Sequence, residues 1–336
     1  RVADQSMVLD FPTGGIVTGA ASPHVDRLVE GNINVYAKAR QAGSSSGYMA
    51  NMALVTSLVN KTDLVLQDKL NHASLLDGGL LSGARFQRFL HNDMNSLNAY
   101  LLKYSKDPKV NKTLVVTDGV FSMDGDTALL NEMSAISKEY GSLLMVDDAH
   151  GLGVLGEEGR GTAYSQGLTQ EDVPVLVGTF GKAFGTSGAF VAGSGLLIEY
   201  LSQVARPYIY TTAMPPSIAA ATRKSLEIIK SADSTRNHLN ALIAYFRKKV
   251  SSLGYVLMPS GTPIQPIVMG SSFKTMALAA FLKEHGILVG AIRPPTVPDK
   301  TARLRITLSA AHSFTQLDYL ISVLSTAAQQ GIVEHD

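Results

Sequence analysis

A chain of 336 residues, 45% of them hydrophobic, can form a large core and more than one domain. Its net charge is +1 and its lysines and arginines form no block, which argues against a nucleic-acid surface. The chain has no cysteine, which excludes disulfides and thiolate metal sites, and no apolar run approaches the roughly 18 residues of a membrane span, so we expect a soluble, cytoplasmic protein.

Strands and helices alternate along the first two thirds of the chain. Strands are predicted within residues 1–11 and at residues 63–67, 85–90, 113–117, 143–147, 175–177 and 187–193. Helices are predicted at residues 52–59, 94–103, 129–140 and 196–204. The run Leu143–Val146 is apolar at every position, as in a strand that is buried on both faces of a parallel sheet. This order predicts an α/β fold with a mostly parallel central sheet.

A long helical region at residues 217–253, with a break at 232–234, contains the expected domain boundary. We predict a large domain at residues 12–225 and a smaller α+β domain at residues 226–336, with residues 1–11 pairing with the smaller one. Strands of the smaller domain are predicted at residues 264–269, 287–292 and 304–308, and helices at 274–285 and 314–329. Ser313 and Gln316 have the spacing of a capping box at the start of the last helix.

Polar residues follow the buried strand at its carboxyl end, where open α/β sheets bind their ligands. Asp147 comes first and His150 three residues later. A carboxylate in this position can bind a metal, orient a base or pair with a protonated ring nitrogen. A second acidic run, at residues 118–126, suggests a calcium loop but lacks the EF-hand spacing, so no metal site is predicted.

Lys182 stands between glycines and aromatic residues, directly after the apolar run Val175–Val177. A lysine packed among residues that exclude water is more easily neutral and can act as a nucleophile. The alternative is a solvated surface lysine. Because Asp147 lies just upstream, we favour a site for pyridoxal phosphate, which needs a lysine for its Schiff base and an acidic residue beside its ring nitrogen.

Two segments, VDDAHG (residues 146–151) and TFGKAFG (residues 179–185), resemble those of the α-oxoamine synthases. These are pyridoxal phosphate enzymes of fold type I that join an amino acid to an acyl-CoA with loss of carbon dioxide. The resemblance extends from about Ser44 to the end of the chain, and its motifs occur in the family's order. It implies a homodimer with pyridoxal 5'-phosphate as cofactor and with Lys182 as the residue that binds it.

The resemblance also implies a cofactor site built from several loops. Asp147 would pair with the ring nitrogen, His150 and Ser122 would lie at the ring oxygen, and His72 would stack on the ring. The other implied cofactor-binding residues are Ser46, Gly47 and Tyr48 at the phosphate, Thr179, and the pair Thr211 and Thr212, of which one reaches the neighbouring subunit. From the residues alone, the Gly/Ser loop and the threonine pair can be plain turns, and a lone histidine is usually structural or exposed.

Arg303 and Arg305 share one face of a predicted strand, because side chains alternate along it. A guanidinium suits bidentate binding of a carboxylate, and a surface salt bridge is the alternative. The resemblance assigns the substrate's carboxylate to Arg305 and adds Thr296 as a substrate-binding residue. The runs AIRPPTVP (residues 291–298) and TARLRITLSAAH (residues 301–312) are most similar to the biotin-pathway branch, which joins L-alanine to pimeloyl-CoA or to a pimeloyl carrier protein.

The family's N-terminal arm and an Asn-Asp-Tyr-Leu-Gly-Leu segment, which help to cover the active site, have no counterpart before the loop at residues 43–47. Either the chain is part of a longer one or these segments are deleted, and a deletion would favour a binding or regulatory homologue without activity. Two enzymatic alternatives are a glycine-using relative, such as 2-amino-3-ketobutyrate CoA ligase, and an aldolase-type lyase on the same fold. No G-x-G-x-x-G motif follows the first strand, so a dinucleotide-dependent dehydrogenase is excluded.

Overall fold

The computed structural model describes residues 40–212 and 214–332, which form two compact units. The first unit comprises residues 40–120 and 128–233, and the second comprises residues 121–127 and 234–332. The second unit therefore includes a short segment from the middle of the first. The strand expected within residues 1–11, and its pairing with the small domain, lie outside the described residues. None of the described helices is long and apolar enough to cross a membrane.

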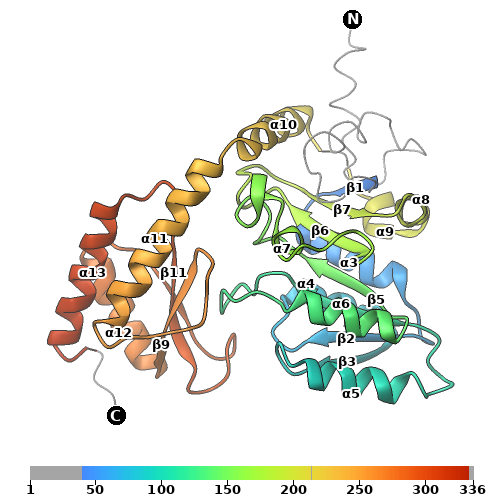
Figure 1. Ribbon diagram of the computed structural model, residues 1–336, viewed down its shortest axis with the longest axis horizontal. Helices are drawn as coiled ribbons and strands as arrows, with labels where there is room; N and C mark the ends of the chain where they lie inside the picture. Colours follow the sequence, from blue (N-terminus) through green and yellow to red (C-terminus); the bar gives the residue numbers. More distant parts are fainter. Residues whose placement is uncertain (1–39, 213, 333–336) are drawn as a thin grey trace, which may run out of the picture. The chain divides into compact units, whose positions relative to one another are not determined.

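The first unit is built on a seven-stranded sheet (Figure 1). In spatial order its strands are β1 (Arg40–Ser44), β7 (Ala189–Gly193), β6 (Val175–Thr179), β5 (Leu143–Asp147), β4 (Thr113–Asp118), β2 (Leu64–Asp68) and β3 (Arg85–Phe89). The strands from β6 to β3 pair in parallel, while β7 is antiparallel to both β6 and β1. The prediction of a mostly parallel central sheet is confirmed.

Helices follow most of these strands. They are α3 (Gly47–Leu58), α4 (Ala73–Leu81), α5 (Met94–Tyr104), α6 (Leu130–Glu139), α7 (Thr162–Ser165), α8 (Gly195–Val204), α9 (Arg206–Ile209) and α10 (Pro216–Lys230), with a 3₁₀ turn η2 (Glu157–Gly159). Helix α3 packs against β6 and β7, and its buried side chains share one core cluster with Val65, Val116, Met145 and Val177. Helices α5 and α6 pack against each other, on β3 and β5 respectively.

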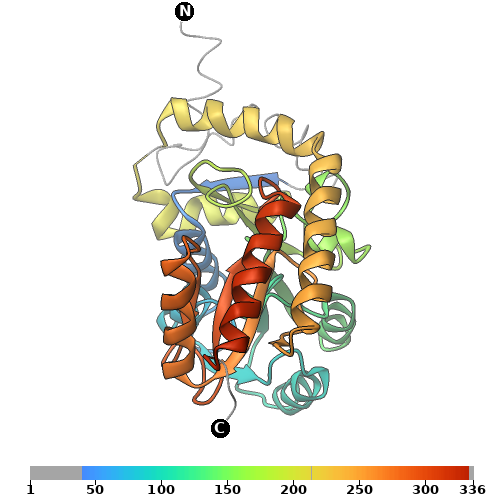
Figure 2. The same cartoon turned by 90° about the vertical axis from the view of Figure 1, so that its left-hand side faces the viewer.

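The second unit has a four-stranded antiparallel sheet. Figure 2 shows its helices, coloured from orange to red. The strand order is β10 (Gly290–Ile292), β11 (Ala302–Thr307), β9 (Ile264–Gly270) and β8 (Val256–Leu257), and the helices are α11 (Asp233–Ser251), α12 (Ser272–Glu284) and α13 (Phe314–Gln329). Helix α12 packs against β9, β11 and α13. The predicted capping box of Ser313 and Gln316 is confirmed at the start of α13.

The carboxyl ends of the parallel strands meet at one end of the first sheet. Four of the strands finish there on a polar residue: β2 on Asp68, β4 on Asp118, β5 on Asp147 and β6 on Thr179. Most side chains before these positions are apolar and buried, although Gln67 on β2 and Thr117 on β4 are buried polar residues. This end of the sheet is therefore the place for a polar site within the first unit.

Candidate active site

Asp147 is almost completely buried, with 6% of its surface exposed. Its Oδ1 accepts a hydrogen bond from the Ala149 N–H at 3.0 Å, and its Oδ2 accepts one from Asn51 Nδ2 at 2.6 Å. Donors on both oxygens hold the carboxyl group in one orientation. Because each carboxylate oxygen can accept more than one hydrogen bond, Asp147 keeps the capacity to receive a further donor from a ligand.

Asp118 lies beside Asp147, because the two residues are partners in the register of β4 and β5. Burial raises the pKa of Asp118 well above its usual 3.8, and the negative charge of Asp147 raises it further. The His72 N–H, which donates to Asp118 Oδ2 at 2.8 Å, and the positive charge of Lys182 both act in the opposite direction. Asp118, Asp147 and the backbone of His72 therefore lie together at the carboxyl end of the sheet, and the positive charge of Lys182 acts on this group.

Asp148, the next residue along the chain, is held quite differently. Its Oδ2 accepts the Thr162 N–H at 2.7 Å and its Oδ1 accepts the Thr162 hydroxyl at 2.6 Å. Complete burial raises the pKa of Asp148 to about 7. The chain passes so close that a Cβ atom on Gly151 would lie only 2.1 Å from Asp148 Oδ1. Asp148 thus fixes the turn after β5, and no room is left beside it for a ligand.

His72 precedes α4 and caps its N-terminus. Its Nδ1 accepts the Ser74 N–H at 3.3 Å and lies 2.8 Å from the Ser74 hydroxyl, while its backbone N–H donates to Asp118. The ring is exposed although its Nδ1 is engaged. The structure therefore brings His72 to the same end of the sheet as Asp147, with a ring face accessible to a ligand.

Lys182 lies in the turn that follows β6. The turn is closed by hydrogen bonds from Gly185 N to Lys182 O and from Thr186 N to Phe180 O, both 2.9 Å long. Phe180 and Phe184 point into the core and contact each other edge to face, whereas Lys182 between them is exposed. The expectation that aromatic neighbours exclude water from this lysine was wrong, because both rings are buried while the lysine is exposed. Its amine is instead accessible from the carboxyl end of the sheet.

The predicted phosphate-binding loop lies at the start of α3. Ser46 caps this helix, since its Oγ accepts a backbone N–H of the first turn at 3.3 Å, and a Cβ atom on Gly47 would lie 3.7 Å from Thr179 Cβ. The N–H groups of Gly47 and Tyr48 are not used by the helix's own hydrogen bonds, which suits a phosphate. The Tyr48 hydroxyl donates to the Asp77 carboxylate, and this hydrogen bond raises the pKa of Tyr48.

The remaining predicted site residues occupy loops. His150 lies half-buried in the turn after β5. Thr211 Oγ1 donates to Pro207 O at 2.6 Å, as a plain turn requires, and Thr212 is exposed. Thr296, in the second unit, is also exposed. The contacts of these residues define no role by themselves, so their predicted roles stay predictions.

The two arginines of β11 have different partners within the second unit. Arg303 is buried, and its Nη1 donates to Asp124 Oδ1 at 2.5 Å. Arg305 is half-buried; its Nε donates to Ser122 O at 2.6 Å and its Nη1 to Thr307 Oγ1 at 3.1 Å. Burial lowers the pKa of Arg305. Arg303 is thus part of a structural ion pair, and these hydrogen bonds of Arg305 leave its Nη2 for another acceptor.

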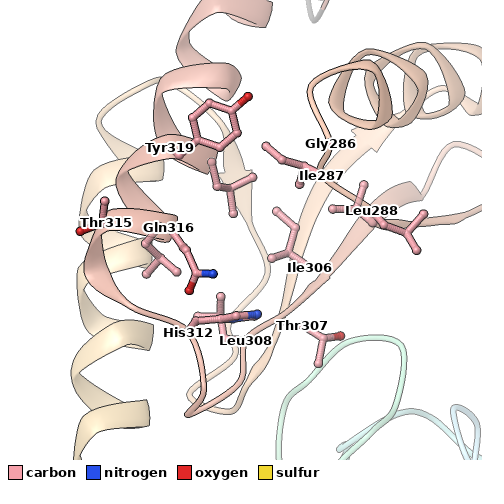
Figure 3. A pocket seen from close by; sticks show the side chains of 13 residues that line it. Gly286, Ile287, Leu288, Ile306, Thr307, Leu308, His312, Thr315, Gln316 and Tyr319 are labelled. Carbon is pink, nitrogen blue, oxygen red and sulfur yellow. The ribbon is translucent and has the colours of Figure 1, made fainter.

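The second unit also contains a cavity of about 610 Å³ (Figure 3). Its walls come from the loop after α12, from β11 and from the first turns of α13, and they include Ile287, Leu288, Ile306, Leu308, His312 and Gln316. None of the predicted site residues lines it. The polar and charged side chains described above lie at the carboxyl end of the first sheet, and we therefore place the candidate site there.

Sequence reasoning missed three polar residues at this site: Asn51, Ser74 and Asp118. A signal for Asp118 was available, because β4 ends on an aspartate one residue after its apolar run, much as β5 ends on Asp147. No comparable signal marks Asn51 or Ser74, which meet each other across two helices. Both are buried and hydrogen-bonded to predicted site residues.

Residues 27–324 match the family described as aminotransferase class I and II. The chain belongs to this family. Curated relatives include the 8-amino-7-oxononanoate synthase of Stutzerimonas stutzeri, which is 57% identical over 310 residues that cover 92% of this chain and 78% of the relative. The 8-amino-7-oxononanoate synthase of Pseudomonas putida is 55% identical over 315 residues, which cover 94% of this chain and 79% of the relative.

Solved structures of related enzymes share the fold. Serine palmitoyltransferase of Sphingomonas wittichii superposes with a TM-score of 0.88 at 32% identity, covering 99% of this chain and 84% of that one. 8-Amino-7-oxononanoate synthase of Francisella tularensis superposes with a TM-score of 0.80 at 30% identity, covering 97% and 91%. The predicted fold type I of pyridoxal phosphate enzymes is confirmed, as is the predicted resemblance to the α-oxoamine synthases.

Proposed function

We propose that this chain catalyses the condensation of L-alanine with a pimeloyl thioester to 8-amino-7-oxononanoate, with loss of carbon dioxide, in biotin synthesis. The cofactor is pyridoxal 5'-phosphate, and the other product is free CoA or free carrier protein, according to the donor. The observation that carries the proposal is the 57% identity to an 8-amino-7-oxononanoate synthase over 92% of the chain. The polar groups at the carboxyl end of the first sheet support it.

Pyridoxal 5'-phosphate carries a ring nitrogen, an aldehyde and a phosphate, and the residues of the first unit suit all three. Asp147 can accept a donor from the ring nitrogen, the exposed amine of Lys182 can reach an aldehyde, and the first turn of α3 can receive a phosphate. Asn51 Oδ1, beside Asp147, is buried without a hydrogen-bond partner among the described residues. A buried acceptor without a hydrogen-bond partner is costly in a protein interior. A bound ligand that donates to this oxygen would remove the cost.

Several residues would hold the cofactor. Asp147 would accept the proton-bearing ring nitrogen, and Lys182 Nζ would anchor the aldehyde carbon covalently. His150 would donate to the ring oxygen, and His72 would stack on the ring face. When bound, pyridoxal 5'-phosphate supplies an electron sink for the charge that develops on the Cα atom of the amino acid.

The substrate-binding roles fall to other groups of the chain. The Arg305 guanidinium would bind the carboxylate of L-alanine, because a planar fork of donors matches its two oxygens. Lys182 Nζ, once released by the incoming amine, would take the Cα proton as general base and later return a proton to the carbon that loses carbon dioxide. His72 would position the carbonyl of the acyl donor, and Thr296 would contact the substrate.

The assembly expected for this function is a cytoplasmic homodimer, with Thr211 or Thr212 contacting the phosphate site of the partner. A two-fold dimer is the commonest assembly of soluble enzymes, and the family resemblance points the same way. The protein would need no nucleic acid and no membrane for this reaction. Its hydrodynamic mass with and without cofactor tests this part of the proposal.

The proposal predicts a defined spectroscopic and chemical response. Purified protein mixed with pyridoxal 5'-phosphate should acquire a visible absorption band, which shifts when L-alanine is added. Addition of pimeloyl-CoA should then release carbon dioxide and free thiol in equal amounts and form 8-amino-7-oxononanoate, identified by mass spectrometry. The Lys182→Ala variant should lose the band and at least about 1,000-fold in turnover, because the covalent anchor and the general base are one group.

The outcomes separate the alternatives. Product from glycine and acetyl-CoA, but not from L-alanine and pimeloyl-CoA, would assign the chain to another α-oxoamine synthase reaction. A cofactor band that ignores thioesters would point to a lyase on the same fold. Protein that stays colourless would rule out a pyridoxal phosphate enzyme, and an unchanged band in Lys182→Ala would remove Lys182 from the mechanism.

A further inference from the structure

Asn51 joins two groups that belong to different parts of the chain. It lies on the buried face of α3, with 1% of its surface exposed. Its Nδ2 donates to Asp147 Oδ2 at 2.6 Å and to Ser74 Oγ at 2.9 Å, which uses both hydrogens of the amide. The opposite amide orientation would place Oδ1 against the Asp147 carboxylate, acceptor against acceptor. The chemistry of its neighbours therefore fixes which way Asn51 points.

Ser74 continues the chain of hydrogen bonds. It is completely buried, and its hydroxyl oxygen receives the N–H of Asn51. The Ser74 hydroxyl can then donate its hydrogen bond to His72 Nδ1, which lies 2.8 Å from Ser74 Oγ. The same nitrogen accepts the Ser74 backbone N–H at 3.3 Å. Both groups facing His72 Nδ1 are donors, so this nitrogen is an acceptor.

A neutral imidazole carries one proton, and the partner of one nitrogen decides where it sits. Because His72 Nδ1 faces two donors, the proton belongs on Nε2. The backbone N–H of His72 is tied to Asp118, so the residue is held at its main chain and at its ring. An Nε2–H group is a hydrogen-bond donor, which suits a carbonyl oxygen that gains negative charge during attack on a thioester.

We infer that Asn51 and Ser74 are positioning residues that connect the cofactor-binding Asp147 to His72 and fix His72 in its Nε2-protonated tautomer. The inference rests on the proposed function for its catalytic meaning, since Asp147 and His72 are given their roles there. The relay Asp147–Asn51–Ser74–His72 has one consequence for the reaction. The group that holds the cofactor and the group that receives the acyl donor are aligned by a single set of hydrogen bonds.

The tautomer can be read directly by ¹⁵N NMR of the cofactor-loaded protein labelled at its eight histidines. The His72 signals are assigned by their loss in His72→Gln. In the wild type we expect an unprotonated Nδ1 and a protonated Nε2. Ser74→Ala, which removes one oxygen atom, should mix the two tautomers, and Ser74→Thr, which keeps the hydroxyl, should restore the wild-type signals.

Kinetics and cofactor binding give a second test of the inferred roles of Ser74 and Asn51. In Ser74→Ala we expect kcat with pimeloyl-CoA to fall about tenfold, the effect of one lost hydrogen bond, and to recover in Ser74→Thr. Cofactor affinity, measured by absorption, should be unchanged in Ser74→Ala because Asn51 still holds Asp147. It should fall in Asn51→Asp, since a carboxylate at this position donates nothing to Asp147 and repels it.

A wild-type His72 protonated on Nδ1 would overturn the inference. So would a Ser74→Ala protein with unchanged ring signals, and a loss of kcat in that variant would then reflect a structural role alone. The NMR readout does not depend on the reaction. If the wild type forms no 8-amino-7-oxononanoate and the ring signals still respond to Ser74→Ala, the proposed function fails and the relay stands.

Discussion

Two regions of the molecule carry two like charges close together in sequence. In both regions, the two charged residues have different kinds of partners. After β5, Asp148 is held by both donors of Thr162, while Asp147 is oriented by Asn51 and keeps capacity for a ligand. On β11, Arg303 forms a buried ion pair, while Arg305 retains a guanidinium nitrogen. In each pair, one member builds the fold and the other is available for chemistry.

The difference within each pair comes from partners far away in the chain. Asp124 is 179 residues from Arg303, and Asn51 is 96 residues from Asp147. Residue type and spacing are nearly the same for both members of a pair, so they cannot tell the two apart. The comparison therefore predicts opposite phenotypes for neighbouring substitutions: loss of stability in one member and loss of substrate binding in the other.

The largest effect is expected for Arg303→Met. It removes the guanidinium from a buried carboxylate, which costs about 3–5 kcal/mol of unfolding free energy. Urea unfolding followed by circular dichroism measures the loss, and Arg303→Lys, which keeps the charge, should lose less. A stable Arg303→Met protein with a raised KM for L-alanine would reverse the roles given to the two arginines.

Arg305→Lys should instead leave the unfolding midpoint close to that of the wild type. An ammonium cannot form the bidentate contact with a carboxylate, so the KM for L-alanine should rise about 10- to 100-fold. Steady-state kinetics at saturating pimeloyl-CoA measure this change, and cofactor affinity serves as the control. An unchanged KM would exclude Arg305 from binding the carboxylate of the substrate.

The most gradual effect is the pH dependence of stability that Asp148 causes. Burial raises its pKa from 3.8 to about 7. The folded protein then holds this proton more tightly than the unfolded chain, so the group's contribution to stability is complete below about pH 4 and is lost as the pH rises through about 7. An asparagine at this position cannot ionise, so the unfolding free energy of Asp148→Asn should fall less steeply with pH than that of the wild type, with a difference of up to about 1.4 kcal/mol per pH unit.

Urea unfolding at several pH values between 4 and 8 tests this, with the wild type as reference, because all other titrating groups are common to both proteins. Equal slopes would mean that Asp148 titrates alike in the folded and unfolded states. The neighbouring Asp147→Asn variant should act mainly on cofactor affinity, which would complete the contrast between the two residues.

The sequence predicted elements whose signals are local. Helix α13 has the predicted bounds because Ser313 and Gln316 close its first turn through their own side chains. The parallel strands were predicted to within one or two residues, since apolar runs end where polar residues begin. The strand expected at residues 287–292 proved shorter, as only Gly290–Ile292 pairs with β11.

Helix α4 was missed because two consecutive glycines lie within it, and glycine disfavours helix. The structure shows why these positions stay helical. A Cβ atom on Gly78 would lie 3.1 Å from Val55 Cβ, and one on Gly79 only 2.5 Å from the Phe86 ring. The glycines allow α4 to approach α3 and β3 closely, and the packing offsets their poor propensity.

The site was predictable where its residues lie in recognisable motifs, as Lys182, Asp147 and His72 do. Asn51 and Ser74 were not, because the hydrogen bonds from Asn51 to Ser74 and to Asp147 join residues on different elements. The exposure of Lys182 was not predicted, since the aromatic residues that flank it in sequence are buried while the lysine itself is exposed. Neighbours in sequence and neighbours in space differ at this turn.

The segment at residues 121–127 belongs to the second unit although β4 leads directly into it. Its Asp124 forms an ion pair with Arg303, and its Gly125 carbonyl accepts hydrogen bonds from Ser260 and Thr262. On the ribosome, this segment emerges long before its partners, so the second unit is completed only after Ser260, Thr262 and Arg303 have been made. If the chain were cut after residue 233, the C-terminal fragment would lack residues 121–127, which are part of its own unit. We therefore expect that this fragment would not fold by itself.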